Sequence, residues 1–178
     1  MADQEKKTKV KKTAMEVAAS YLANRMRTVE EMRKRLKEKE FSEAEIEETV
    51  NDLIGLKYLD DYAYAVRYYE YNTAKHRGSY RAMRELEEKG VDKQTVKFAL
   101  EDYLYEHKVD EYQIALEVAR KEVFTMDDNF DEPSVVAKEI DDKLVAKVAR
   151  KLEARGFKRD DIYRVLDEMR RWDKSLMS

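Results

Sequence analysis

Clusters of basic side chains are the groups in this sequence whose types and spacing are best suited to bind an anion. Residues 24–39 contain seven basic and three acidic side chains, residues 73–84 contain four basic and no acidic ones, and residues 143–159 contain seven basic and one acidic. Each segment is a candidate surface for nucleic acid or for an acidic protein. The candidate contact residues are Arg33, Lys34, Tyr68, Lys75, Arg77, Tyr80, Arg81, Arg84, Lys147, Arg150, Lys151 and Arg155. The alternative is an ordinary solvated surface, because acidic segments at 40–61 and 122–142 alternate with the basic ones.

The segment 73–84 is the strongest of the three candidates. Gly78 precedes a predicted helix, and free backbone N–H groups at that helix start would add to the basic charge. We expect the side chains of Arg77, Arg81 and Arg84 to be largely exposed.

Seven tyrosines lie between residues 58 and 80. One stripe of the predicted helix has Tyr64, Tyr68 and Tyr71, and another has Tyr62 and Tyr69, so both stripes cannot be core. Exposed tyrosines are favoured at protein interfaces and can stack on nucleic-acid bases. The alternative is that about half of the seven are core and the rest only line a groove between helices.

Residues suited to catalysis are sparse. The chain has no cysteine, and His76 and His107 are far apart, which argues against thiol catalysis, a histidine metal site and a Ser–His–Asp triad. The adjacent carboxylates Asp60 and Asp61 are interpreted as helix caps. All four glycines are isolated, so there is no glycine-rich phosphate loop. We expect no enzymatic activity, no cofactor and no metal ion.

Charge and hydropathy indicate the class of protein. The sequence has no apolar run of transmembrane length, and its first residues are too polar for a signal peptide. A net charge of −3 argues against general binding of nucleic acid, although a chain with alternating charged segments can still present a basic face. We expect a cytoplasmic monomer.

Composition favours an all-α fold. Among 178 residues there are only 4 Gly and 1 Pro, too few for the tight turns of a sandwich or barrel.

A motif centred on a leucine occurs three times, at Leu36, Leu86 and Leu152. Apolar residues follow each leucine at offsets of 10, 14 and 17, which place them on one helical stripe. They are Ile46, Val50 and Leu53, then Val96, Leu100 and Tyr103, then Ile162, Leu166 and Met169. The position two residues before each leucine is basic in all three copies, which would give the repeats a basic strip of Lys34, Arg84 and Arg150.

Each copy predicts two helices joined by a tight turn, with a further helix before them near 14–26, 60–75 and 110–124. The sequence therefore predicts nine helices. Gly90 and Gly156 stand where a left-handed helix cap is expected, whereas the first copy has Glu40 there and should have a weaker cap.

Local capping signals mark several helix starts. Thr28–Glu31 and Ser42–Glu45 have the spacing of capping boxes, and Asp92 can cap the corresponding helix of the second copy.

The spacing of the motifs predicts the domain organisation. The leucines are 50 and then 66 residues apart, and the extra residues near 125–140 include the only proline and many acids, so we expect a loop or added helical turns there. The predicted parts are a disordered basic arm at 1–12, three-helix repeats at 13–57, 58–108 and 109–172, and a tail at 173–178. Such repeats would form an elongated, curved helical solenoid.

Several of these motifs resemble the RecX family of bacterial RecA regulators. They are Tyr58–Asp61 with Ala63 and Ala65, Leu86–Val91, Leu152–Phe157 with Ile162 and Leu166, and, in the first copy, Tyr21, Leu22, Arg25, Arg27, Thr28 and Leu36–Lys39. The match covers about residues 14–170 and implies three tandem three-helix repeats. It also implies binding along the groove of the RecA–DNA filament, contact with more than one RecA protomer, and suppression of ATPase and strand exchange. The acidic composition and the 125–140 insertion depart from the family pattern.

The resemblance implies a non-enzymatic inhibitor of RecA that modulates recombination, DNA repair and the SOS response. The alternative function is a helical repeat protein that binds nucleic acid directly through its basic strip, with weak affinity for single- or double-stranded DNA. RecA ATPase on single-stranded DNA separates the two, because only a filament regulator must change it.

Overall fold

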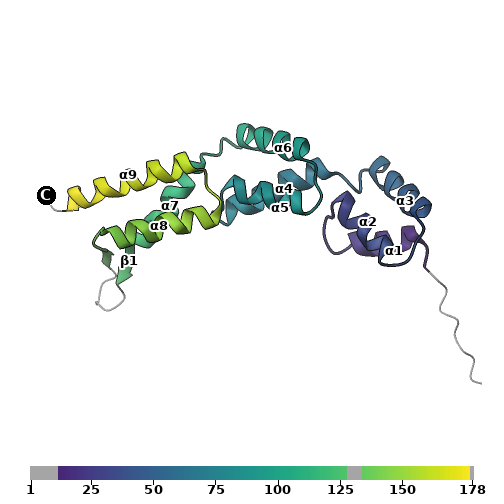
Figure 1. Ribbon diagram of the computed structural model, residues 1–178, viewed down its shortest axis with the longest axis horizontal. Coiled ribbons are helices and arrows are strands. Elements are labelled where there is room, and N and C mark those ends of the chain that lie inside the picture. The colour runs from purple at the N-terminus through teal and green to yellow at the C-terminus, as the bar shows by residue number, and fades with distance from the viewer. Residues whose placement is uncertain (1–11, 128–133, 177–178) are drawn as a thin grey trace, which may run out of the picture. The chain divides into compact units, whose positions relative to one another are not determined.

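The computed structural model describes residues 12–127 and 134–176, which form nine helices and one short hairpin (Figure 1). The helices are α1 (Ala14–Leu22), α2 (Val29–Lys37), α3 (Glu43–Gly55), α4 (Asp61–Ala74), α5 (Ser79–Glu88), α6 (Lys93–Glu106), α7 (Glu111–Val123), α8 (Asp142–Arg155) and α9 (Arg159–Leu176). The prediction of an all-α fold built from three-helix repeats is confirmed. Helix α1 ends earlier than expected, and α9 continues into the predicted tail.

The helices begin where local side chains satisfy their first amide groups. Thr28 and Ser42 form the predicted capping boxes with Glu31 and Glu45, and Asp92 accepts hydrogen bonds at the start of α6. Thr13 forms a third capping box with Glu16, at the start of α1, which was not predicted.

The turn between the second and third helix of each repeat has the same backbone geometry. Glu40, Gly90 and Gly156 have φ angles of 60°, 83° and 81°, in the left-handed region. In each turn the amide five residues after the central leucine donates to that leucine's carbonyl, over 3.4, 3.1 and 3.2 Å. The predicted left-handed turns are therefore confirmed, including the one that must hold a glutamate.

All twelve apolar positions predicted from the repeated motif are buried. The chain forms two compact units that divide between Tyr64 and Ala65. In the first unit, Leu36, Ile46, Val50 and Leu53 pack with residues of α1 and with Leu59. In the second unit, one cluster joins the inner faces of α7, α8 and α9, with Leu152 and Met169 fully buried.

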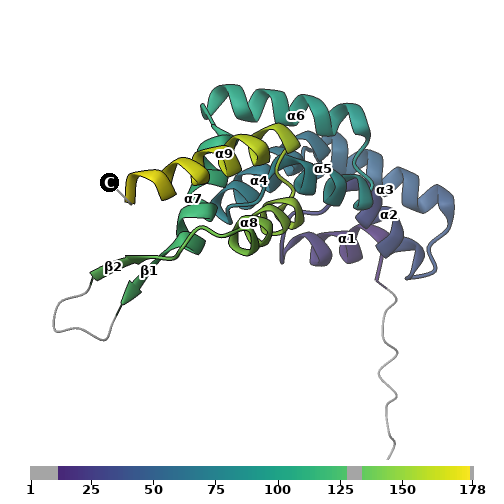
Figure 2. The same cartoon turned by 60° about the vertical axis from the view of Figure 1, so that its left-hand side comes forward.

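The segment near 125–140 differs from the expected loop or helical turns. Strands β1 (Phe124–Asp127) and β2 (Ser134–Ala137) form an antiparallel hairpin between α7 and α8 (Figure 2). Thr125, paired with Val136, is β-branched like its partner, and such residues favour strands over helices. The rest of the acidic insertion, 128–133, lies outside the described residues, as do residues 1–11 of the predicted arm and 177–178 of the tail.

Within the described ranges, none of the helices combines the length and apolarity needed to cross a membrane.

Candidate functional site

Two glycines bring the start of α5 against the turn between α8 and α9. The amide of Gly78 donates to the carbonyl of Arg155 over 2.9 Å, and the amide of Tyr80 donates to the carbonyl of Gly156 over 3.1 Å. A Cβ at Gly78 would collide with the backbone of Gly156, and one at Gly156 would collide with Arg81. The second and third repeats therefore approach closely enough for direct backbone hydrogen bonds.

This contact corrects the expectation that the amides after Gly78 are free to bind phosphate. The amides of Gly78 and Tyr80 are already bonded to the α8–α9 turn. The Ser79 amide donates to the Glu111 carboxylate over 2.5 Å, and the Ser79 hydroxyl donates to the same carboxylate over 2.8 Å. A helix start that is already occupied in this way offers no anion site. Glu111 was not predicted, because nothing in its local sequence distinguishes it from the many other acids.

Arg155 also belongs to this contact. Its guanidinium donates to the carbonyls of Lys75 and His76, over 3.1 and 2.9 Å, just after the end of α4. His76 has a left-handed φ of 53° and lies 2.9 Å from Glu117. Arg155, predicted as a contact for a partner, therefore holds the second and third repeats together.

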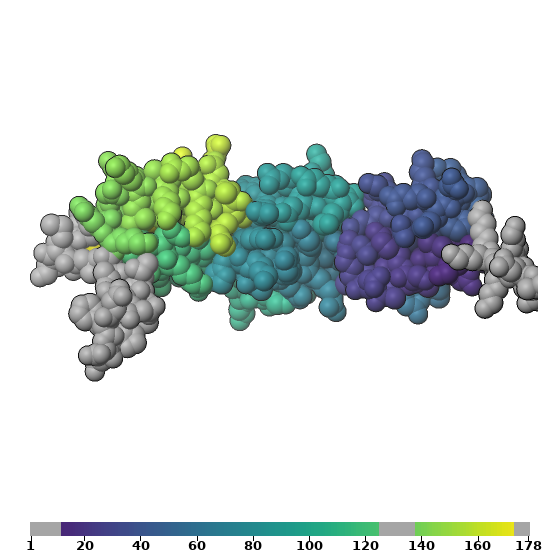
Figure 3. All heavy atoms as spheres, turned by 90° about the horizontal axis from the view of Figure 1, so that it is seen from below, coloured from purple at the N-terminus to yellow at the C-terminus, as the bar shows by residue number. Residues whose placement is uncertain are grey.

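A basic groove of 400 Å³ lies beside this contact, between α5 and the α8–α9 turn. The space-filling view shows the two repeats packed directly against each other (Figure 3). Tyr80 is 55% exposed and the Arg84 side chain 71%, and Arg159 is also exposed. The charged lining residues of this groove, called the α5–α9 groove below, are Arg81, Arg84, Lys158, Arg159, Glu153 and Asp160. Four cations against two carboxylates make its lining basic, and two of these cations also have a carboxylate just outside it, since Glu88 lies 3.9 Å from Arg84 and Glu111 3.8 Å from Lys158.

Arg81 is less available than expected. Its Nε lies 2.8 Å from Glu85, and the Tyr68 hydroxyl donates to the other oxygen of that carboxylate over 2.6 Å. Burial raises the pKa of Glu85, but these hydrogen bonds outweigh it and the net pKa is lowered. The expectation that Arg77, Arg81 and Arg84 are all largely exposed is wrong, since only Arg84 is exposed and the other two are half-buried.

The basic cluster on α8 is divided between paired and free side chains. Lys147 and Lys151 both bind Glu122, near the end of α7, with Lys147 at 2.8 Å. Their hydrogen bonds lower the pKa of Glu122 to about 2. Arg150 is exposed and does not line the groove. Lys147 and Lys151, predicted as contacts for a partner, are thus paired with Glu122 within the chain, which their neighbours in the sequence did not indicate.

In the first unit, Arg33 forms a two-pronged ion pair with Glu47 of α3, at 2.8 and 3.0 Å. The pair raises the pKa of Arg33 and lowers that of Glu47 through the shared hydrogen bonds. The neighbouring Lys34 is exposed. A basic strip that includes Lys34 together with residues of the second unit stays a prediction.

The tyrosines of α4 occupy both buried and exposed positions, but the two stripes do not separate them, since buried Tyr64 belongs to one stripe and buried Tyr69 to the other. Tyr69 is buried and donates to the carbonyl of Val96 over 2.9 Å, and its burial raises its pKa. Tyr71 is half exposed, with Lys75 and Arg77 about 6 Å from its ring (6.0 and 5.9 Å). Of the seven, Tyr64 and Tyr69 are buried, fewer than the half that the alternative interpretation gave.

The adjacent carboxylates at the start of α4 have different roles. Asp60 accepts a hydrogen bond from the amide of Ala63 over 2.9 Å, as expected of a cap. Asp61 instead accepts from the amide of Val29, over 2.9 Å, at the start of α2. In the described part of the chain, no group of three or more histidine or acidic residues is arranged to hold a metal ion.

Comparison with known proteins supports the interpretation of the repeats. Residues 14–53, which span α1 to α3, match the family model described as RecX, first three-helix domain. The resemblance to RecX proteins is confirmed. The regulatory protein RecX of Halalkalibacterium halodurans is 35% identical over 109 residues, which cover 61% of this chain and 41% of that protein. RecX of Bacillus cytotoxicus is 29% identical over 156 residues, covering 86% and 52% of the two chains. The chain thus spans about half the length of the curated relatives it matches.

Solved RecX structures have the same fold. The crystal structure of RecX from Lactobacillus salivarius superposes with a TM-score of 0.69 at 23% identity, covering 87% of this chain and 93% of that one. A second crystal structure, of a regulatory protein RecX, has a TM-score of 0.67 at 24% identity and covers 86% and 71%.

Proposed function

We propose that this protein is an inhibitor of RecA that binds in the groove of the RecA–DNA filament. The observation that carries the proposal is the similarity to regulatory RecX proteins across 86% of the chain. The helical repeats and the basic α5–α9 groove support it, because they offer a binding surface rather than a set of catalytic groups. The protein acts by binding and not by catalysis.

The α5–α9 groove is the contact surface in this proposal. Arg84 and Arg159 meet carboxylates or phosphates of the filament, and Tyr80 supplies an aromatic contact with a polar end. The hydrogen bonds at Gly78 and Gly156 keep the second and third repeats as one surface that spans neighbouring RecA protomers. Such bridging limits the subunit motions that ATP turnover requires, and occupation of the groove excludes a second DNA duplex.

RecA ATPase on single-stranded DNA tests this function. We expect hydrolysis to fall as the protein is added, with half of the effect well below one molecule per RecA. The protein alone should hydrolyse no ATP and should cut no DNA. Unchanged RecA ATPase at equimolar protein would contradict the proposal.

A charge-matched pair of variants tests the groove itself. Arg84→Glu with Arg159→Glu reverses two exposed cations in the groove and should weaken inhibition, because attraction becomes repulsion. Lys97→Glu with Arg171→Glu makes the same change in charge at exposed residues of α6 and α9 outside the groove. Equal inhibition by the two double variants would mean that the groove is an ordinary solvated surface.

The repeats at 13–57, 58–108 and 109–172 form a cytoplasmic monomer in this proposal. Light scattering during size-exclusion chromatography should give a mass of 21.2 kDa. A dimer would require a different account of how neighbouring protomers are bridged.

A further inference from the structure

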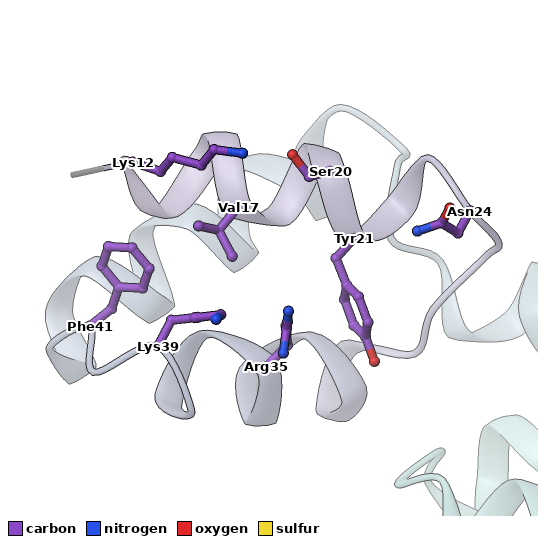
Figure 4. Close-up of a pocket in the computed structure, with 8 residues that line it drawn as sticks. All are labelled: Lys12, Val17, Ser20, Tyr21, Asn24, Arg35, Lys39 and Phe41. Atoms are coloured by element: carbon purple, nitrogen blue, oxygen red, sulfur yellow. The ribbon is translucent and has the colours of Figure 1, made fainter. Parts of the chain in front are cut away.

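The first unit contains a pocket of 410 Å³ between α1 and the turn that follows α2 (Figure 4). Val17 and Tyr21 line it from α1, Arg35 rises into it from α2, and Lys39 and Phe41 close it from the turn. Its volume falls within the range of small-molecule sites. None of its lining residues belongs to the α5–α9 groove.

The pocket is cationic and has no carboxylate in its lining. Lys12, Arg35 and Lys39 are its charged residues. Arg35 has one distant acidic contact, Glu38 at 3.5 Å, and its Nε is buried without a hydrogen-bond partner in the structure. Among the described residues Lys12 and Lys39 have no ion pair. Three cations with so little compensation favour a multiply charged anion such as a phosphate monoester.

The rest of the pocket is suited to a flat apolar group. Tyr21 and Phe41 contribute aromatic rings, and Val17 adds an aliphatic surface between them (Figure 4). The guanidinium of Arg27 lies 3.8 Å from the centre of the Tyr21 ring, and that of Arg35 lies 5.5 Å from it. Arg27 covers one face of the Tyr21 ring, and the rest of the ring, which lines the pocket, offers an aromatic surface on which a base can stack irrespective of its sequence.

We propose that this pocket binds one nucleotide unit, with its phosphate on Arg35, Lys39 and Lys12 and its base against Tyr21. The nucleotide can be free or part of a single strand, since both present the same phosphate and base. This site is separate from the proposed RecA function and does not depend on it.

Isothermal titration calorimetry of the full chain with 5′-dAMP, deoxyadenosine and inorganic phosphate tests the site. Because stacking and charge both contribute, 5′-dAMP should bind about tenfold more tightly than either half alone. Equal affinities for 5′-dAMP and phosphate would overturn the proposal, since only an anion site would remain. No measurable binding of 5′-dAMP at low salt would overturn it as well.

Matched variants place the binding in this pocket. Arg35→Gln with Lys39→Gln should abolish binding of 5′-dAMP, and Tyr21→Leu should reduce it to the affinity of phosphate. Lys34→Gln with Lys37→Gln removes the same charge from α2 at residues that do not line the pocket, and should leave binding unchanged. If the double variant unfolds, the single variant Lys39→Gln replaces it, because Lys39 is an exposed turn residue. It should weaken binding of 5′-dAMP. Equal loss in the control pair would overturn the assignment.

The source of the nucleotide is distinguished by a short single-stranded oligonucleotide. Tighter binding of deoxyadenosine tetranucleotide than of 5′-dAMP, lost in the Arg35 and Lys39 variant, would assign the pocket to a single strand. Equal binding per molecule would assign it to free nucleotide. Equal binding of an acidic peptide such as tetra-aspartate, lost in the same variant, would overturn the proposal.

Discussion

At the residue scale, Glu40 departs from the pattern of its repeat. Gly90 and Gly156 hold the same left-handed position in the other two turns, where glycine has no Cβ to resist a positive φ. Glu40 adopts φ of 60° at an exposed site, and its side chain gains no hydrogen bond to a residue in 12–127 or 134–176 that would compensate.

Glu40→Gly should therefore stabilise the first unit by about 1 kcal/mol, because it removes the steric cost of the left-handed conformation. The reverse change in the second repeat, Gly90→Ala, should destabilise by a similar amount. Urea unfolding followed by circular dichroism gives both values from the shift in midpoint. A destabilised Glu40→Gly variant would show that the glutamate side chain has a stabilising role.

Glu122 is a second residue whose environment has a measurable consequence. Its folded pKa of about 2 lies below its ordinary value of 4.5, so the ion pairs with Lys147 and Lys151 stabilise the fold most fully above pH 4.5. That stabilisation is lost as the pH falls from 4.5 towards 2, because the folded carboxylate must then accept a proton.

Glu122→Gln should lower the free energy of unfolding by about 1 kcal/mol at pH 7 and reduce its dependence on pH between 4.5 and 2. Urea unfolding at several pH values measures both effects. The exposed Glu139→Gln is the control and should change neither. An identical acid transition in wild type and Glu122→Gln would mean that the two lysines contribute nothing to stability.

At the element scale, the contact between the start of α5 and the α8–α9 turn depends on backbone proximity. Gly78 has an extended φ of −75° that any residue can adopt, so its requirement for glycine comes only from the nearby backbone of Gly156. Gly78 has no side chain with which to cap α5, and the first amides of the helix are instead satisfied by the α8–α9 turn and by the carboxylate of Glu111, all from the third repeat.

Gly78→Ala should destabilise the second unit by about 1–3 kcal/mol, because its Cβ must displace the α8–α9 turn. Urea unfolding followed by circular dichroism measures this loss of stability, and fluorescence of Trp172, which packs against Phe124, assigns it to the second unit. Gly55→Ala is the control, since its Cβ would meet open space at the end of α3 and should stabilise slightly. Equal stability of Gly78→Ala and wild type would show that the α8–α9 turn can shift without a loss of free energy of unfolding.

At the scale of the whole molecule, charge separates binding of bare DNA from binding of a protein filament. A net charge of −3 opposes a polyphosphate, while the α5–α9 groove carries a local excess of cations. Attraction to bare DNA must therefore come from few contacts, whereas a filament adds contacts to protein.

Binding to free duplex DNA should accordingly be weak and should fall steeply with salt, because phosphate contacts release counterions. Binding to RecA-coated DNA should be tighter and less sensitive to salt. Fluorescence anisotropy across a salt titration measures both affinities. Equal affinities and slopes for bare and coated DNA would instead support the alternative function, direct binding of nucleic acid.

The sequence alone determined the features that depend on neighbours along the chain. The apolar offsets of 10, 14 and 17 residues predicted the buried stripe that contains Ile46, Val96 and Ile162, because helical periodicity decides which side chains share a face. Capping at Thr28 and Ser42 was equally predictable, since the bonded groups lie three residues apart.

Only the tertiary structure decided which charged residues have a partner that is distant in the sequence. Arg155 and Arg84 are both basic residues of repeated segments, yet Arg155 binds carbonyls about eighty residues away (sequence separations of 80 and 79), while Arg84 stays exposed in the groove with Glu88 of its own helix 3.9 Å away. The pairing of Lys151 with Glu122 and the occupied amide of Gly78 likewise join distant segments. Partners of this kind come together only when the helices pack. The residues next to a charged side chain in the sequence therefore do not show which group will lie opposite it in the fold.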